Sequence, residues 1–180
     1  TGFQGNYITA VGFEALKNDT WGYFNTGIGS SALLSNTTGL ANTSVGANSL
    51  YSNTTANFNT AVGSSALRLN TTGESNVFVG NQSGVVNSTG YENIFLGRES
   101  GFNNNVGFRN IFIGYQSGYS NTTADYNTAY GLSALYSNTT GQNNSANGYN
   151  ALYKNTTGEF NIANGMEALY YNTTGYHNIA

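Results

Sequence analysis

Apolar and polar positions follow a short pattern that returns every 17 residues. The stretch NTAVGSSALRLNTTG (59–73) reappears as NTGIGSSALLSNTTG (25–39) and as NTAYGLSALYSNTTG (127–141). When NTAVG is numbered as positions 3 to 7, ten repeats without an insertion cover residues 6–175. The end of a preceding repeat occupies 1–5 and a partial eleventh repeat occupies 176–180. A fixed period of this kind is the signature of a repeat architecture.

The length of the period predicts one β-coil per repeat. A helical pair needs more than about 30 residues, whereas 17 residues rich in Gly, Thr, Val, Ile and Tyr, without Pro, suit short strands and turns. We expect NTAV to form a short strand, the glycine at position 7 a corner, and ALY a second short strand. NTTG would be the return turn, where Asn and Gly tolerate left-handed backbone angles. The predicted fold is an all-β, parallel β-solenoid, or β-roll, of ten 17-residue coils stacked about 4.8 Å apart.

A volume exchange within the repeat supports this fold. Position 5 is small wherever position 11 is Leu, but in the three middle repeats position 5 is Phe and position 11 is Gly. These residues are Phe78, Phe95 and Phe112, with Gly84, Gly101 and Gly118. Close packing requires such a compensation when two positions fill the same interior space. We therefore expect positions 5 and 11 to face each other in the core, with the three Phe rings stacked as a ladder.

If position 5 points inward, the alternation of a strand directs positions 4 and 6 outward. Position 6 is apolar through the first seven repeats, at Val11, Ile28, Val45, Val62, Val79, Leu96 and Ile113. An exposed apolar stripe favours a partner, most simply an identical chain lying alongside. The alternative is that a bent coil buries both faces of the strand by itself.

The phrase NTAVGxxAL resembles the head repeats of trimeric autotransporter adhesins and the related repeats of bacterial surface-fibre and phage tail-fibre proteins. The resemblance spans essentially the whole chain. NTAVG, NIFIG and NTSVG match the NSVAIG-like core of that family, whereas the extended YSNTTG turn departs from it. The resemblance implies that three chains each wind a left-handed β-roll around a common axis, outside the cell, at its surface or on a virion fibre.

Charge and composition exclude several classes of protein. Only 7% of residues are charged, the net charge is −3 and no basic run occurs, so a nucleic-acid partner is not expected. No apolar run approaches the roughly 20 residues needed to cross a bilayer, so we expect no membrane insertion by this segment. The chain begins at the end of one repeat and stops within another, which suggests a segment of a longer fibre.

Few residues could carry catalysis. There is no Cys and only one His, His177, so we expect no catalytic triad, no metal site and no cofactor. A glycosidase needs only two carboxylates, and Glu74 and Glu92 lie in adjacent repeats. However, Arg109 occupies the position of Glu92 one repeat later, which favours a surface ion pair. We therefore expect that the protein is not an enzyme.

Two columns of repeated residues each have two interpretations. Aromatic residues recur at position 12, where they would either bind sugar rings or stack on each other: Tyr51, Tyr119, Tyr136, Tyr153 and Tyr170, with Phe102. Asn recurs at position 14 as an N-x-Ser/Thr sequon, at Asn36, Asn53, Asn70, Asn87, Asn121, Asn138, Asn155 and Asn172. These eight would either carry N-linked glycans or form a ladder of amide hydrogen bonds from coil to coil.

The sequence thus predicts a structural, adhesive segment of an extracellular or cell-surface fibre, built by coil stacking and by self-association as a homotrimer or a higher assembly. The alternative is a carbohydrate-binding rod, like that of a phage tail fibre, which binds host or environmental glycans through the Tyr column. A third interpretation, ice binding by the Thr residues at position 4, is weakened because Val77, Ile94 and Ile111 interrupt that column.

Overall fold

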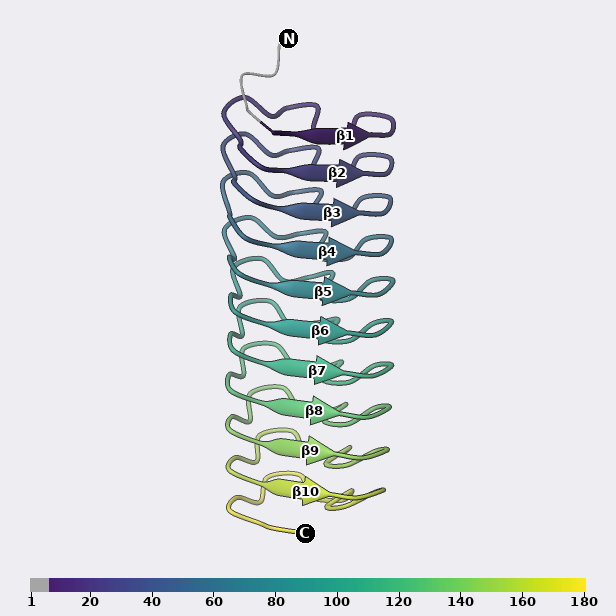
Figure 1. Ribbon diagram of the computed structural model, residues 1–180. Coiled ribbons are helices and arrows are strands. Elements are labelled where there is room, and N and C mark those ends of the chain that lie inside the picture. Colours follow the sequence, from purple (N-terminus) through teal and green to yellow (C-terminus); the bar gives the residue numbers. More distant parts are fainter. Residues whose placement is uncertain (1–6) are drawn as a thin grey trace.

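The computed structural model describes residues 7–180, which form a rod of stacked coils (Figure 1). Each coil contributes one three-residue strand, and all ten strands form a single parallel sheet in sequence order. The strands are β1 (Thr9–Val11), β2 (Thr26–Ile28), β3 (Thr43–Val45), β4 (Thr60–Val62), β5 (Val77–Val79), β6 (Ile94–Leu96), β7 (Ile111–Ile113), β8 (Thr128–Tyr130), β9 (Ser145–Asn147) and β10 (Ile162–Asn164). The predicted all-β, parallel β-solenoid is confirmed. Residues 1–5, assigned above to a preceding repeat, lie outside the described residues.

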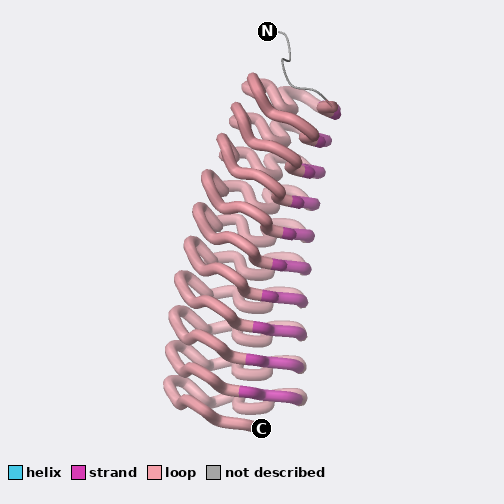
Figure 2. Tube along the Cα trace, turned by 60° about the vertical axis from the view of Figure 1, so that its left-hand side comes forward, coloured by secondary structure: helices cyan, strands magenta, loops and turns pink. Residues whose placement is uncertain are grey.

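The coils pair in strict register and wind with a left hand. Each strand residue pairs with the residue 17 positions later, as Thr60 does with Val77 and Ala61 with Phe78. In Figure 1 the strands lie in front and run from left to right, and the chain returns behind them as successive coils descend. This sense of winding is left-handed. Figure 2 shows that the strands line one side of the rod, whereas loops and turns form the rest of each coil.

The glycine at position 7 forms a corner, as predicted. All ten of these glycines have φ between 131° and 141°, a region that L-residues rarely adopt. Space also excludes a side chain here, because a Cβ on Gly46 would lie 2.6 Å from the carbonyl carbon of Gly63 in the next coil. The corner therefore depends on glycine for both its backbone angle and its packing.

The second strand predicted at positions 10 to 12 is wrong. This segment consists of turns in which positions 9 and 11 adopt left-handed angles, with φ of 56° at Ser31 and 51° at Leu33. The coils still bond to one another here, because the Leu33 N–H donates to the Ser49 carbonyl at 3.1 Å. The prediction of left-handed backbone angles in the NTTG turn is also wrong. In residues 7–180 the positive φ angles occur at positions 2, 7, 9 and 11 instead.

The predicted volume exchange is confirmed. Phe78, Phe95 and Phe112 are fully buried and stacked, with ring centroids 4.3 and 4.9 Å apart and interplanar angles of 15° and 13°. A Cβ on Gly101 would contact the ring of Phe95, and the other two pairs show the same conflict. Each Phe ring therefore fills the space that a leucine at position 11 fills in the flanking coils.

Two ladders of buried Asn side chains complete the interior. At position 14, the Asn53 amide donates to Asn36 Oδ1 at 2.9 Å and to the carbonyl of Ala56 at 3.1 Å. At position 3, Asn25 Oδ1 accepts the backbone N–H of Asn42 at 2.9 Å, and the Asn42 amide donates to the same Ala56 carbonyl. Within residues 7–180 no buried side-chain nitrogen or oxygen lacks a hydrogen-bond partner. Sequence analysis missed the position 3 ladder, although Asn stands there in every repeat from the second onward.

Candidate functional site

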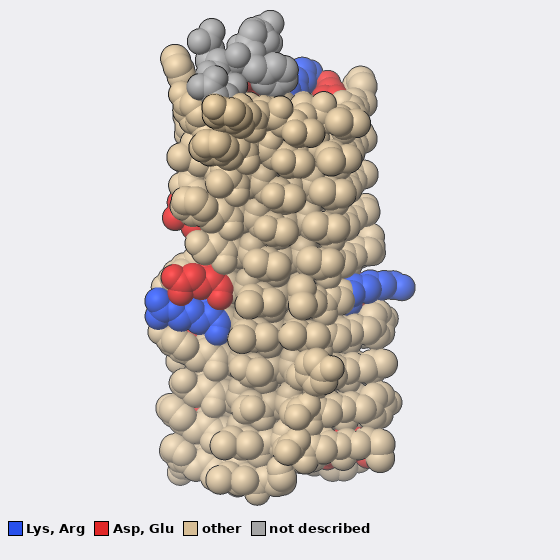
Figure 3. Space-filling view, in the orientation of Figure 1, with Lys and Arg blue, Asp and Glu red and all other residues tan. Residues whose placement is uncertain are grey.

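The strand side of the rod presents a flat and uncharged face. In β5 and β8 the middle residue is buried and both neighbours are exposed, which is the alternation expected for positions 4 to 6. None of the seven apolar residues at position 6 is buried, and Val11 and Ile28 are 57% and 38% exposed. The coil therefore does not cover this stripe by itself. Figure 3 shows the strand face from the front, with charged atoms gathered at its two edges and at the upper end of the rod.

The apolar character of the strand face ends after β7. Position 6 continues as Tyr130, Asn147 and Asn164, and the Asn147 amide donates to Asn164 Oδ1 at 3.1 Å. Position 4 follows a different course: it is Thr in β1 to β4, apolar in β5 to β7, polar in β8 and β9, and Ile162 in β10. At position 6 the strand face thus consists of an apolar part, β1 to β7, and a more polar part, β8 to β10.

Exposed aromatic and aliphatic side chains border the strand face on both sides. Position 8, just after the strand, is Ser, Ala, Asn or Arg beside β2 to β6. In the other coils it carries Phe13, Tyr115, Leu132, Tyr149 and Met166, all at least 40% exposed. Position 2, just before the strand, carries Tyr7, Phe24, Phe58, Tyr126 and Phe160, all at least 45% exposed. The apolar surface is therefore wider than the strands alone.

The aromatic column at position 12 stacks on itself. The rings of Phe102, Tyr119, Tyr136, Tyr153 and Tyr170 follow one another with centroids 5.0 to 5.1 Å apart and interplanar angles of 2° to 15°. The structure contradicts the sugar-binding interpretation for Tyr119, Tyr136 and Tyr153, because both faces of each ring are covered by neighbouring rings. Tyr51 stands apart from this stack, with the Arg68 guanidinium 5.9 Å from its ring centroid. Burial raises the pKa of Tyr136 and Tyr153.

The structure also contradicts N-glycosylation of the position 14 column in the folded chain. Seven of the eight side chains are fully buried and Asn172 is half-buried. In each repeat the amide nitrogen donates to the carbonyl three residues later, as from Asn138 to Gly141 at 2.9 Å. A glycan on that nitrogen would need space inside the rod and would disrupt the ladder. The ladder interpretation of this column is therefore the correct one.

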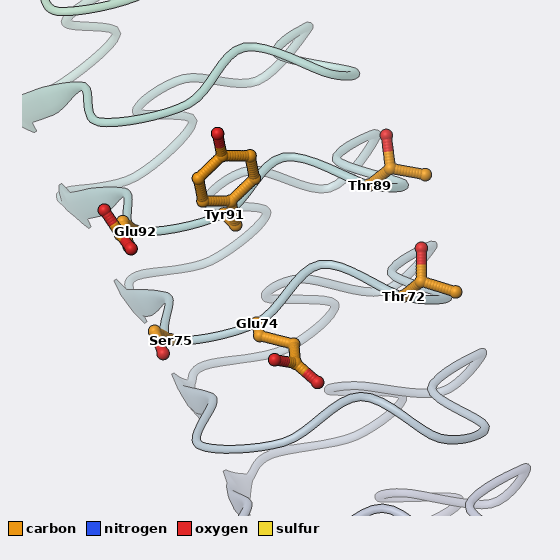
Figure 4. A pocket seen from close by; sticks show the side chains of 6 residues that line it. All are labelled: Thr72, Glu74, Ser75, Thr89, Tyr91 and Glu92. Atoms are coloured by element: carbon orange, nitrogen blue, oxygen red, sulfur yellow. The ribbon is translucent and has the colours of Figure 1, made fainter.

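The two carboxylates considered for catalysis border a shallow depression of about 220 Å³ beside the strand face. Its lining residues are Thr72, Glu74, Ser75, Thr89, Tyr91 and Glu92. In Figure 4 the two carboxylates extend in different directions from neighbouring coils. Each has another partner, because Glu74 Oε1 accepts from the Asn57 amide at 2.8 Å and Glu92 Oε2 accepts from Arg109 Nε at 2.6 Å. The predicted ion pair is confirmed, and the two groups do not form an acid–base pair.

The remaining titratable groups are dispersed along the rod. A hydrogen bond from Gln116 lowers the pKa of Glu99, whereas burial raises the pKa of Asp125. The pKa of Arg109 is raised, chiefly by its hydrogen bond to Glu92. His177 is exposed and stacks on Phe160 with ring centroids 5.0 Å apart. Over residues 7–180 no three His, Cys, Asp or Glu side chains come together as a metal site would require, and no helix in that part is long and apolar enough to span a membrane.

Comparison with protein-family models, with curated proteins and with solved structures found no match to this chain.

Proposed function

We propose that this chain is a structural segment of an extracellular fibre, in which identical rods associate side by side through their strand faces. The observation that carries the proposal is the apolar part of the strand face, in which none of the seven apolar side chains at position 6 is buried. Contiguous exposed apolar surface on a soluble protein marks an interaction site. Adhesion is the function we expect of such a rod when it is displayed at a surface.

The geometry of the strand face favours an identical chain as the partner. Its side chains repeat once per coil along a straight line, so a complementary surface must have the same spacing over several coils. A second copy of the chain meets this requirement without any further adaptation. The resemblance to trimeric adhesin heads supports three chains around one axis as the closed arrangement.

The size of the face indicates that its borders take part in the contact. The seven strands of the apolar part, about 4.8 Å apart and each about 10 Å long, give a flat area of roughly 340 Å². A specific interface usually buries about 800 Å² per partner. Exposed apolar residues also border the apolar part, and the proposed interface includes them. They are Tyr7, Phe24 and Phe58 at position 2, and Phe13 and Tyr115 at position 8.

Light scattering of purified chains tests this proposal. The mass of the native particle is expected to be a small multiple of 19.0 kDa, and three chains would support the trimer. Val62→Lys places a charge in the apolar part of the face and should yield monomers. The matched control, Asn147→Lys, changes an exposed residue of the same column in the polar part and should leave the assembly intact. A monomeric wild-type chain, or full assembly of the Val62→Lys variant, would overturn the proposal.

A further inference from the structure

The depression between the coils of Glu74 and Tyr91 leaves one aromatic face unstacked. The Tyr91 ring stacks on Phe108 in the following coil, with centroids 4.7 Å apart and an interplanar angle of 5°. In the preceding coil the same position holds Glu74 instead of an aromatic residue. Figure 4 shows Tyr91 and Glu74 on neighbouring coils, with the two side chains extending away from each other. The stack therefore begins at Tyr91, whose ring face toward Glu74 meets no other ring.

Residues with polar side chains line the depression together with Tyr91. Three of the residues that line the depression, Thr72, Ser75 and Thr89, carry a hydroxyl group, which can donate and accept a hydrogen bond. Glu74 and Glu92 each use one carboxylate oxygen for the partners described above, so the second oxygen of each can accept a hydroxyl proton. The Arg109 ion pair holds the Glu92 carboxylate at the border of the depression.

We propose that this depression binds one pyranose ring of a neutral saccharide. A pyranose has a face of C–H groups, which packs on an aromatic ring, and a rim of hydroxyl groups, which need acceptors. Tyr91 supplies the aromatic face, and Glu74 and Glu92 supply the acceptors. Because both acceptors are anionic, a sugar that carries its own carboxylate is disfavoured. The depression borders the strand face, since Ser75 and Glu92 belong to the position 2 row. The proposal places saccharide recognition at position 1 of the repeat, outside the position 12 column.

A second place in the rod shows which features are specific to this depression. The order of Glu followed by Tyr at position 1 recurs at Glu159 and Tyr176. There the neighbouring position 2 residues are Phe160 and His177, whose rings stack on each other. The serine hydroxyl and the glutamate carboxylate at that border of the depression are therefore replaced by a ring stack. We assign saccharide binding to the depression at Tyr91 alone.

Titration of the whole chain with simple glycosides, followed by NMR of the aromatic side chains, tests the assignment. The probes are the methyl glycosides of glucose and of galactose, with glucuronic acid as the charged comparison. At least one neutral glycoside should shift the Tyr91 ring signals in a saturable way, and glucuronic acid should bind at least tenfold more weakly. Tyr91→Ala should weaken binding of the neutral glycoside by about tenfold or more, since it removes the stacking face.

Two control variants separate stacking from indirect effects. Tyr91→Phe keeps the ring and should bind within about twofold of the wild-type chain, because the acceptors are unchanged. Tyr136→Ala removes a ring from the covered column and should leave the affinity unchanged. Absence of a saturable shift with both neutral glycosides, preference for glucuronic acid, or undiminished binding by Tyr91→Ala would each overturn the proposal.

Discussion

The ring of Phe95 occupies the space in which a side chain at residue 101 would lie, since a Cβ on Gly101 would come within 2.5 Å of Phe95 Cδ2. Both residues belong to the same coil, at positions 5 and 11. In the flanking coils the small residue and the large residue are exchanged, as with Ala61 and Leu67. In each coil the core is thus filled by one large side chain, which comes from either position 5 or position 11.

Reversal of this exchange in one coil gives the first prediction. Phe95→Ala should lower the free energy of unfolding by about 3–5 kcal/mol, because it leaves a cavity between two buried rings. The double variant Phe95→Ala with Gly101→Leu reproduces the arrangement of the flanking coils and should recover a large part of that loss. Chemical denaturation of the wild-type chain and of the three variants, including Gly101→Leu alone, completes a double-mutant cycle. Additive effects would contradict the shared interior space.

The glycine corner provides a second prediction with an internal control. Gly46→Ala combines a φ of 132° with a Cβ that would lie 2.6 Å from the next coil. At Gly165 the φ is 137°, but no atom lies within 4 Å of the added Cβ. We expect Gly46→Ala to destabilise the chain by at least about 2 kcal/mol more than Gly165→Ala, since only the former adds a steric conflict to backbone strain. Equal losses in thermal melting would show that strain alone requires the glycine.

The ladder at position 3 gives a third prediction. Asn93→Ala removes the acceptor of the Asn110 backbone N–H, at 2.9 Å, and the donor to the Gly107 carbonyl, at 2.8 Å. The buried Asn110 N–H would be left unpaired, whereas the Gly107 carbonyl would keep the Asn104 amide as a donor at 2.9 Å. The loss should therefore be about 1–3 kcal/mol. Asn81→Ala changes an exposed Asn with one long hydrogen bond of 3.4 Å and serves as the control. A loss in Asn93→Ala no greater than in the control would contradict the role of the ladder.

A fourth prediction concerns the pH dependence of stability at Asp125. Burial raises the pKa of this carboxyl in the folded chain, while a hydrogen bond from the Phe108 N–H at 2.9 Å opposes the shift. A raised folded pKa means that the charged form is less stable in the folded chain, so the contribution of Asp125 to stability is highest below its unfolded pKa. That contribution decreases as the pH rises through the folded pKa.

Replacement by Asn should remove this penalty. The amide oxygen can accept the same backbone hydrogen bond, as Asn57 Oδ1 does from the Leu40 N–H at 2.8 Å. The melting temperature of Asp125→Asn should therefore exceed that of the wild-type chain at neutral pH, and the difference should vanish below about pH 4. A difference that grows on acidification would contradict the sign of the shift.

Sequence analysis predicted those features that follow from the 17-residue period and from the side-chain volumes at positions 5 and 11. The strand at positions 4 to 6, the corner at Gly63 and the Phe ladder all follow from the spacing of residues and from close packing. The turn around Leu135 was not predictable in this way, because an Ala-Leu-Tyr composition is typical of regular structure and gives no sign of a left-handed φ. Bonds between coils compensate for that unfavourable angle, and these exist only after stacking.

The candidate sites were less predictable than the fold. The sequon at Asn138 describes three residues and contains no information on burial, which the rest of the coil determines. The column of Tyr136 allowed two interpretations, and the separation of neighbouring rings decides between them. Sequence analysis did not identify Tyr91 as a candidate residue. Its position carries no regular aromatic column, and its open face depends on the single Glu74 in the coil before it.

The in-register hydrogen bonds between coils also determine how the rod would respond to force. The strands lie across the long axis, so tension along that axis acts directly on the bonds that join one coil to the next. Every coil contacts only its two neighbours, and detachment of a terminal coil leaves the remaining coils intact. Each detached coil of 17 residues would lengthen the chain by about 50 Å. Under load the rod would therefore extend in uniform steps from its ends and dissipate energy at each step.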